Sequence, residues 1–474
     1  MKVRNPRTGQ HDYQILPLDA ATVQATARRL SAGQPAWAAR SPDERAEVLR
    51  ALARAIGARR EAIAQALTVD TGRRAISTIE VDGTVRTLER WAATAPDLIA
   101  RATGGERPSA TPGIAVTMRL VSYPLVGVIS PWNFPLTLAL IDAIPALAAG
   151  CAVLVKPSEV TPRFIAPLMA AVREVPQLAD VLAVIEGDGA TGAAMVDAVD
   201  FVAFTGSVAT GRKVAAAAAR AFIPASLELG GKDPMLVLAS ADPAWAAQVA
   251  LRASVVNTGQ ACQSIERVYV ARAIAPAFLD ALVSAAQAAR LNADDIGAGE
   301  LGPFIFASQA EIVQRHIDDA RARGARELAG GVVEEHGGGL YLRPTVLTDV
   351  PADAAVMREE TFGPVIPVGT FDTVDEAVGL ANAGEFGLSA AVLAGGAGEA
   401  EAVAMRLNAG AVSINDGALT SMVWDAEKSS FGASGLGPSR MGESGLLRFF
   451  RRQALLRQTG QALPLAAYAE DARR

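Results

Sequence analysis

The chain has 474 residues, of which 50% are hydrophobic, so it is long enough to form two or three folded lobes instead of one small core. Its formal net charge of -6 provides no basic surface for nucleic acid or an anionic membrane, and we expect neither partner. No apolar run reaches the ~18 residues of a membrane-spanning helix, and residues 1–6 lack the apolar segment of a signal peptide, so we expect a soluble cytoplasmic protein.

Residues 19–101 follow a helical pattern, with Ala, Leu, Val and Ile recurring every three or four residues between charged side chains. Ser41 is typical of a helix start, because proline and two acidic residues follow it in the first turn. We expect these helices to pack against the rest of the chain without contributing to chemistry.

A turn-rich break at residues 103–113 precedes a strand-like stretch at 114–121. The following part of the chain alternates short apolar strands with turns and helical runs, and this alternation predicts βαβ units in a doubly wound parallel sheet. Ligands of such sheets bind beyond the carboxyl ends of the strands. The predicted strands are 127–130, 151–155, 181–185 and 201–204, and a second α/β lobe is predicted from strands at 234–238, 364–368 and 411–415.

Three separate stretches carry candidates for nucleophilic chemistry. Cys262 lies in a turn of small residues before an apolar strand, where it is either a nucleophile or a small buried hydrophobic residue. Glu228 ends an apolar run just before a Gly-Gly turn, and apolar surroundings raise the pKa of a carboxyl group into the range of a general base. Asn133 lies between aromatic residues and prolines in residues 131–135, in a stiff loop that offers a hydrogen-bond donor.

The remaining cysteine and the histidines suggest no further site. Cys151 opens an apolar strand and is typical of a core residue. The three histidines, His11, His316 and His336, lie near no other candidate group in the sequence. A Cys-His or Ser-His-Asp hydrolase and a His-ligated metal site are therefore poorly supported, and we expect no metal.

Six strings in a fixed order resemble the aldehyde dehydrogenase superfamily. They are Pro-Trp-Asn-Phe-Pro (131–135), Lys-Pro-Ser-Glu (156–159), Phe-Thr-Gly-Ser (204–207), Glu-Leu-Gly-Gly-Lys (228–232), Gly-Gln-Ala-Cys (259–262) and Glu-Glu-Thr-Phe-Gly-Pro (359–364). Each string alone is a weak signal, but their order and spacing agree over nearly the whole chain.

The resemblance implies an aldehyde dehydrogenase-like α/β fold with three parts. A dinucleotide-binding domain with a doubly wound parallel sheet would comprise residues 1–102 and 123–230, and a catalytic domain with the nucleophilic cysteine would comprise 231–445. A small β element for oligomerisation would comprise 103–122 and 446–474, so a homodimer or homotetramer is expected.

The resemblance also implies NAD(P)-dependent oxidation of an aldehyde to a carboxylic acid. Cys262 would form a thiohemiacetal and then a thioester, and Asn133 with the backbone N–H of Cys262 would stabilise the alkoxide. Glu228 would activate the hydrolytic water, and Lys156 is placed among the catalytic residues as well. Relatives that transfer the acyl group to coenzyme A commonly lack this glutamate, so hydrolysis is favoured. The alternatives are such an acylating relative and a thiol acyltransferase or esterase without redox chemistry.

The implied cofactor site extends over several strand ends. Lys156 and Glu159 would bind the adenosine ribose, residues 206–207 the pyrophosphate, and Glu360 with Phe362 the nicotinamide end. A carboxylate at Glu159 would accept hydrogen bonds from a ribose 2′-hydroxyl and repel a 2′-phosphate, which favours NAD over NADP. The complete predicted set is Ser130, Pro131, Trp132, Lys156, Ser158, Glu159, Gly189, Phe204, Thr205, Gly206, Ser207, Leu229, Gly230, Glu360 and Phe362.

The substrate end departs from the familiar family pattern. Many relatives carry Pro-Phe-Gly-Gly-x-Lys-x-Ser-Gly, whereas residues 431–442 here read Phe-Gly-Ala-Ser-Gly-Leu-Gly-Pro-Ser-Arg-Met-Gly after an apolar loop at 419–424. No cluster of arginine or lysine indicates an anionic group on the substrate, so we expect an uncharged aliphatic or aromatic aldehyde. The predicted substrate-pocket residues are Trp132, Phe134, Leu138, Gln263 and Trp424.

Overall fold

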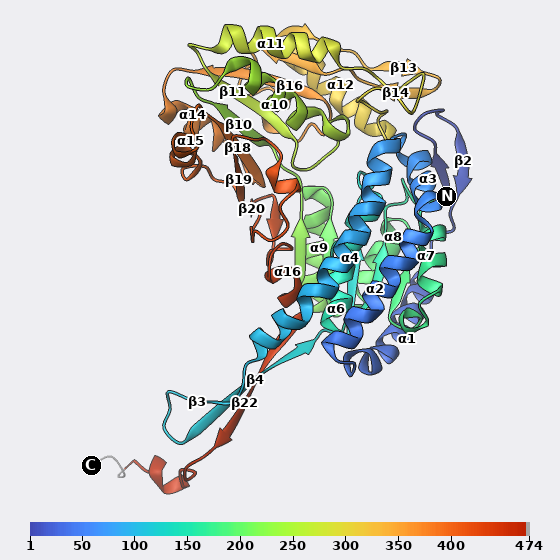
Figure 1. Cartoon of the computed structure of the whole chain (residues 1–474), viewed down its shortest axis with the longest axis vertical. Coiled ribbons are helices and arrows are strands. Elements are labelled where there is room, and N and C mark those ends of the chain that lie inside the picture. The colour runs from blue at the N-terminus through green and yellow to red at the C-terminus, as the bar shows by residue number, and fades with distance from the viewer. Residues whose placement is uncertain (471–474) are drawn as a thin grey trace.

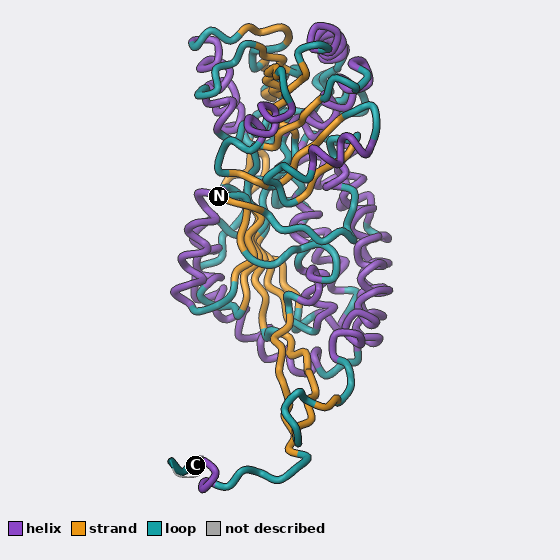
Figure 2. The backbone as a smooth tube through the Cα atoms, turned by 90° about the vertical axis from the view of Figure 1, so that its left-hand side faces the viewer, coloured by secondary structure: helices purple, strands orange, loops and turns teal. Residues whose placement is uncertain are grey.

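Two large sheets and a projecting hairpin organise the chain (Figure 1). The structure, a computed structural model, describes residues 1–470, and the last four residues of the predicted oligomerisation tail, 471–474, lie outside that range. Helices flank the strands on both sides in the rotated view (Figure 2). This arrangement confirms the predicted α/β fold class.

The N-terminal region pairs two short strands, β1 (Lys2–Arg4) and β2 (His11–Gln14), and then forms four helices. Ser41 caps the second helix as predicted. Its hydroxyl accepts the Glu44 N–H at 3.1 Å, and the Glu44 carboxylate accepts the Ser41 N–H at 2.7 Å. The helices are α1 (Ala20–Ala38), α2 (Pro42–Ala58), α3 (Arg60–Thr71) and α4 (Arg74–Thr103), and they share one hydrophobic core with the first sheet.

The first sheet has six strands in the order β21-β9-β8-β5-β6-β7, and all neighbours are parallel except β21 and β9. The predicted strands are confirmed to within two residues at each end. The strands are β5 (Leu125–Ile129), β6 (Ala152–Lys156), β7 (Leu182–Val184), β8 (Phe201–Thr205), β9 (Ala225–Glu228) and β21 (Gly435–Leu436). The helices between them are α5 (Pro135–Leu140), α6 (Ala143–Ala149), α7 (Ile165–Arg173), α8 (Gly189–Val196) and α9 (Val208–Ala221).

The second sheet has seven strands in the order β12-β15-β16-β11-β10-β18-β19, and only β12 and β15 pair antiparallel. Hydrophobic clusters cover both of its faces, which explains the continuous apolar runs of these strands. The strands are β10 (Asp233–Val237), β11 (Ile265–Ala271), β12 (Arg326–Ala329), β15 (Thr345–Thr348), β16 (Val365–Phe371), β18 (Ser389–Leu393) and β19 (Ala411–Ile414). The helices are α10 (Pro243–Val255), α11 (Ala275–Ala288), α12 (Ala307–Ala322), α13 (Ala355–Arg358), α14 (Val374–Ala381) and α15 (Ala397–Ala404).

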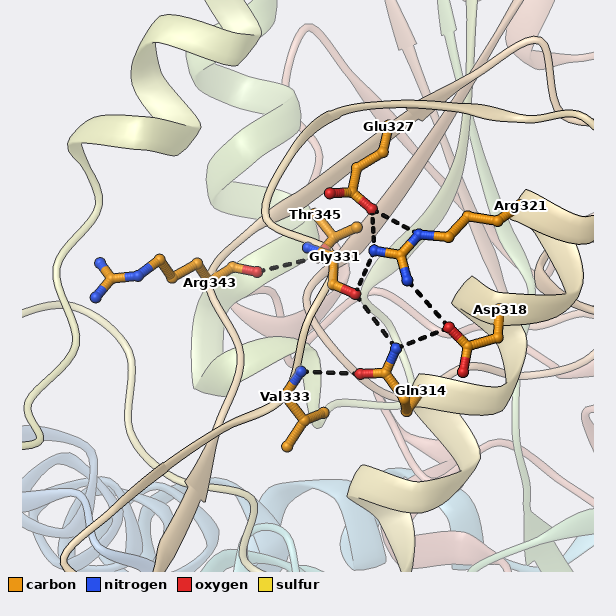
Figure 3. Close-up of polar contacts among 8 residues, drawn as sticks. All are labelled: Gln314, Asp318, Arg321, Glu327, Gly331, Val333, Arg343 and Thr345. Carbon is orange, nitrogen blue, oxygen red and sulfur yellow. Dashed lines mark hydrogen bonds and ion pairs between the residues drawn. The ribbon is translucent and has the colours of Figure 1, made fainter.

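A polar network fixes the connection between β12 and the β13 (Glu334–His336) to β14 (Gly339–Tyr341) hairpin (Figure 3). The carbonyl oxygen of Gly331 accepts hydrogen bonds from Arg321 Nη2 at 2.8 Å and from Gln314 Nε2 at 3.3 Å. Gln314 Oε1 also accepts the Val333 N–H at 2.9 Å. Because Gln314 and Arg321 both lie on α12, this connection is held to the helix.

Residues 431–436 link the two large sheets. β20 (Phe431–Gly432) pairs with β17 (Phe386–Gly387) beside the second sheet, and β21 then pairs with β9 in the first sheet. A segment that we predicted to belong to the catalytic domain therefore completes the sheet of the other lobe.

A three-stranded antiparallel sheet, the projecting hairpin with an added strand, extends from the lower end of the molecule (Figure 1). It consists of β3 (Arg107–Pro108), β4 (Ile114–Ser122) and β22 (Phe450–Gln458), and α16 (Ser444–Leu447) precedes β22. Adjacent residues Leu455 and Leu456 on β22 are 45% and 70% exposed, so this strand buries neither of its faces within the chain. Within residues 1–470, no helix combines the length and apolar character needed to cross a membrane.

Candidate active site

Cys262 lies in the turn between the short helix η2 (Val256–Gly259) and β11. Asn257 and Thr258 have φ angles of 60° and 58°, in the left-handed region that residues other than glycine rarely adopt. Gly259 follows with φ of 67°, and a Cβ there would lie 2.3 Å from the carbonyl carbon of Gly363. The turn that carries Cys262 is therefore packed directly against the segment that follows Glu360.

Hydrogen bonds hold both the side chain and the backbone of Asn133 in place. Its side-chain Nδ2 donates to the carbonyl oxygen of Gln260 at 3.0 Å. Its own backbone carbonyl accepts from Arg73 Nη2 at 2.9 Å and from Asn257 Nδ2 at 3.2 Å. A primary amide has two N–H groups, so one remains available to stabilise an oxyanion.

Cys262 and Asn133 line the same cavity, which has a volume of about 250 Å³. Its other walls come from both sheets: the residues after β8, the turn after β9 and the segment around Glu360. The predicted cofactor residues that line it are Pro131, Trp132, Thr205, Gly206, Ser207, Leu229, Gly230, Glu360 and Phe362. The predicted residues outside this lining are Ser130, Lys156, Ser158, Glu159, Gly189 and Phe204.

Glu228 is the last residue of β9 and immediately precedes the Leu229–Gly230 wall of the cavity. Its Oε2 accepts a hydrogen bond from the Ser430 hydroxyl at 2.9 Å. Ser430 immediately precedes the segment 431–436 that links the two sheets, so the position of this carboxylate depends on tertiary structure that the sequence pattern did not reveal.

The Cys262 thiol is a weak acid in this structure. Burial raises its pKa to about 12, and the carboxylates of Glu360, Asp233 and Glu228 add to the shift while Lys428 opposes it. An unperturbed thiol has a pKa near ~8.5. The thiol is therefore protonated at neutral pH, and a nucleophilic role requires a base that removes the proton during the reaction.

A buried carboxylate that the sequence analysis missed holds the segment around Glu360. Glu266 on β11 accepts the backbone N–H groups of Thr361 and Phe362, each at 2.8 Å. It also accepts a hydrogen bond from Lys232 Nζ at 2.6 Å, in an ion pair that is almost fully buried. Its only signal in the sequence was that it and Arg267 are charged residues within a mostly apolar strand.

The Glu360 side chain lies against the Gly-Gly turn after β9. Its Oε1 accepts the Gly231 N–H at 3.2 Å, and a Cβ on Gly230 would lie 2.5 Å from its Oε2, so a side chain at Gly230 would displace it. Burial raises the pKa of Glu360 to about 8, and the neighbouring Glu266 contributes in the same direction.

The predicted cofactor residues follow three neighbouring parallel strands. Ser130 follows β5, Lys156 ends β6 and Thr205 ends β8, and β5 pairs with both β6 and β8. Gly189 and Ser207 lie at the starts of the helices that follow β7 and β8. Because these strands are parallel, all five residues lie at one edge of the sheet, where dinucleotides bind in doubly wound folds.

The residues at this edge fit a dinucleotide. The Ser130 hydroxyl oxygen is buried without a hydrogen-bond partner, which leaves a donor and acceptor for a ligand. Lys156 Nζ donates to the Gly187 carbonyl at 3.0 Å and to Glu159 Oε2 at 3.2 Å. Lys156 therefore lies with the predicted ribose site, and the structure does not bring it to the thiol.

The predicted substrate residues separate into two groups. Trp132 and Leu138 line the Cys262 cavity, and the Trp132 ring contacts Phe362 edge-on with 5.5 Å between centroids. The others do not line it. Phe134 packs under the Arg73 guanidinium, Gln263 accepts a hydrogen bond from Thr420, and Trp424 lines a second pocket.

The lining around Trp424 is apolar in part, as expected, but it also includes charged side chains. Arg86, Arg90 and Arg440 line the second pocket together with Trp424. The three arginines are separated by up to 354 positions in the chain, so no local cluster marks them in the sequence. The reason for expecting an uncharged aldehyde is thereby removed.

His316, which lies far from every candidate residue in the sequence, contacts the segment around Glu360 in the structure. His316 Nδ1 lies 3.2 Å from the Thr361 hydroxyl, and its Nε2 lies 3.5 Å from a carboxylate oxygen of Glu359. Burial lowers the pKa of His316, so its ring supports the segment as a neutral polar group. Cys151, by contrast, is fully buried, as a core residue should be.

The fold and this cavity define an α/β enzyme in which a thiol and an amide meet the ligand-binding edge of a doubly wound sheet. Residues 1–455 match the model of the aldehyde dehydrogenase family. The Mycolicibacterium smegmatis protein named "Putative succinate-semialdehyde dehydrogenase", with NADP(+) in its name, is 37% identical over 443 residues, covering 92% of this chain and 84% of that protein. Betaine aldehyde dehydrogenase from Cereibacter sphaeroides is 37% identical over 414 residues, covering 86% and 84%.

The solved structure of "Putative Aldehyde Dehydrogenase PutA" from Anabaena variabilis superimposes with a TM-score of 0.96 at 50% identity, covering 98% of this chain and 99% of that one. The chain belongs to the aldehyde dehydrogenase family, and it is an oxidoreductase that acts on aldehydes with a nicotinamide cofactor.

Proposed function

We propose that this enzyme oxidises its aldehyde through a thioester on Cys262 and releases the acid by hydrolysis, with Glu228 as the general base. The observation that carries the proposal is the cavity that Cys262 and Asn133 share with the turn after Glu228. Glu228 itself does not line the cavity, but its charge acts on the Cys262 thiol. A nucleophile, an oxyanion donor and a nearby base are the groups that this chemistry requires.

The first step forms a bond between Cys262 Sγ and the carbonyl carbon while Glu228, directly or through water, takes the thiol proton. The carbonyl oxygen becomes an alkoxide that the Asn133 amide and the Cys262 backbone N–H stabilise. NAD, when bound, accepts the hydride that leaves this carbon. Glu228 then passes the thiol proton to solvent and is again a free carboxylate. A water attacks the thioester and gives its proton to Glu228, the C–S bond breaks, the Cys262 thiolate takes that proton back from Glu228, and the carboxylic acid leaves.

Glu228→Gln tests the base role. We expect a burst of up to one equivalent of reduced cofactor that forms more slowly than in the unchanged enzyme, because the thiol must lose its proton to water alone. The steady rate that follows should be about 100-fold or more below that of the unchanged enzyme, because the thioester persists. Absorbance of the reduced nicotinamide in stopped flow, without coenzyme A, measures both phases. Cys262→Ala is the control and should give neither phase. Normal turnover of Glu228→Gln would remove this residue from the base role, and a strict requirement for added coenzyme A would identify an acylating enzyme.

For the cofactor we propose NAD as the preferred nicotinamide. The Glu159 carboxylate lies beside Lys156 at the end of β6, where it would bind ribose hydroxyls and repel a 2′-phosphate. We expect kcat/KM for NAD to exceed that for NADP by about tenfold or more, and Glu159→Gln to reduce this ratio. Parallel titrations of both cofactors measure it, and a ratio below one in the unchanged enzyme would contradict the preference.

We further propose the three-part division into residues 1–102 with 123–230, 231–445, and 103–122 with 446–474, and a homo-oligomer joined through the last part. Exposed leucines on β22 support the oligomer, because a single chain gives them nothing to pack against.

The names of the relatives do not decide the charge of the substrate. Succinate semialdehyde is an anion and betaine aldehyde is a cation.

A further inference from the structure

The second pocket, with a volume of about 550 Å³, shares a wall with the Cys262 cavity. On α5 and the residue after it, Leu138 lines the Cys262 cavity while Thr137 and Ile141 line the second pocket. Arg440 also lines the second pocket, and its Nη2 donates to the hydroxyl of Thr205, a residue of the Cys262 cavity, at 2.6 Å. α5 and this side-chain pair therefore lie where the two spaces adjoin.

This pocket adjoins the part of the Cys262 cavity that the proposed cofactor residues do not line. Most of the Cys262 cavity is lined by the residues proposed to hold the cofactor, including Gly206, Gly230 and Glu360. A bound cofactor would therefore fill that part of the cavity, which leaves the part beside Leu138 for the aldehyde.

The pocket has a positive lining. Arg86 and Arg90 lie one turn apart on α4, on the face that also contributes Gly83, Thr84 and Thr87. Arg440, on the opposite side, is nine-tenths buried and pairs with Asp142 at 2.9 Å.

Asp142 does not neutralise the charge around it, because it also pairs with the fully buried Arg448. One carboxylate thus serves two guanidinium groups. The Nε atom of Arg440 is buried with no hydrogen-bond partner. A buried cation in this condition is costly unless an anion or a hydrogen-bond acceptor reaches it.

Arg90 is short of partners in the same way. Its guanidinium stacks on the ring of Trp424 at 4.3 Å, which leaves the in-plane N–H groups for other acceptors, and its Nε is buried without one. Burial lowers the pKa of Arg90, and the charge of Asp425 offsets part of that shift.

We propose that this pocket binds a carboxylate carried by the aldehyde substrate, with Arg90 as the main anion-binding residue, so that the enzyme acts on short aldehydes with a distal carboxylate. The inference rests on the proposed function, because the aldehyde group must reach Cys262. Unpartnered donors on two sides of one pocket are the arrangement that a carboxylate satisfies, and guanidinium groups bind carboxylates in paired hydrogen bonds. A quaternary ammonium aldehyde would meet repulsion in the same pocket.

The test compares substrates that differ in charge at equal carbon number. 4-Oxobutanoate is matched with butanal, 5-oxopentanoate with pentanal, and betaine aldehyde serves as the cation, each with saturating NAD. We expect kcat/KM for at least one oxo acid to exceed that of its matched alkanal by tenfold or more, with betaine aldehyde poorest. Raising the ionic strength should reduce the preference.

Arg90→Met removes the charge and keeps much of the side-chain length. We expect the ratio of kcat/KM between the oxo acid and the alkanal to fall about tenfold or more. Arg54→Met, an exposed arginine on the neighbouring helix α2, is the matched control and should keep the ratio. Should Arg90→Met fail to fold, the substrate series and its salt dependence in the unchanged enzyme decide the question.

An equal or greater preference for alkanals or for betaine aldehyde in the unchanged enzyme would overturn the proposal, and so would an unchanged ratio in folded Arg90→Met. If no aldehyde of any charge were oxidised in a manner that depends on Cys262, the proposed function itself would fail. The two failures are therefore distinguishable.

Discussion

The Cys262 thiol retains its proton at neutral pH, because burial and nearby carboxylates raise its pKa to about 12. A raised pKa lowers the thiolate fraction at every pH below it. We therefore expect iodoacetamide to alkylate the cofactor-free enzyme at pH 7.5 at least about tenfold more slowly than it alkylates a free cysteine, with a rate that still increases at pH 10. Quenched mass spectrometry measures this rate.

Cys262→Ala provides the background, which should be small because the other thiol, Cys151, is fully buried. A rate that levels off near pH 8 would show that the thiolate is already present at rest. Glu228 would then be needed only for hydrolysis and not for thiol activation.

At the scale of an element, the segment 359–364 depends on one ion pair buried beneath it. Glu266 holds the backbone of Thr361 and Phe362 and compensates the charge of Lys232. Glu266→Gln leaves this lysine buried and uncompensated, so we expect a loss of about 3 kcal/mol in the free energy of unfolding and weaker NAD binding through displacement of Glu360. Urea unfolding and NAD titration measure the two effects.

Asp372→Asn is the matched control for that prediction. Its carboxylate pairs with Arg272 at 2.6 Å on the surface, where both side chains are more than half exposed. Exposed pairs contribute little, so we expect a loss below about 1 kcal/mol and unchanged NAD binding. Similar losses in the two variants would show that the Glu266 pair contributes no more than a surface contact.

At the scale of the whole molecule, the projecting sheet of β3, β4 and β22 leaves apolar side chains of β22 without a packing partner in its own chain. We expect the protein to run in light scattering at two or four times its chain mass of 49.0 kDa. Leu456→Glu should shift it toward the monomer, because a charge on this 70% exposed leucine would be buried at the interface. Phe222→Glu, at a 97% exposed position on the body, should leave the mass unchanged. A monomeric unchanged protein would contradict the proposed oligomer.

Local patterns were sufficient for much of the fold. The Ser41 cap and the strands of the parallel sheet follow from short-range chemistry and apolar periodicity, and both predictions are confirmed. The same patterns could not place β21, because two residues carry no periodicity and its pairing with β9 spans over 200 positions. Ser430, which orients Glu228, depends on that pairing and was missed for the same reason.

The sequence by itself determined the family, the α/β class and the candidates Cys262, Glu228 and Asn133. Each of these three residues lies in a short string whose residue types indicate its chemistry without knowledge of the fold. Only the tertiary structure decided which groups surround them. Lys156 lies away from the thiol, His316 lies beside the Glu360 segment, and Arg90 and Arg440 face one pocket from opposite ends of the chain. Charge in a pocket is summed over space and not along the chain, so the sequence suggested an uncharged substrate where the folded protein places three arginines around one pocket.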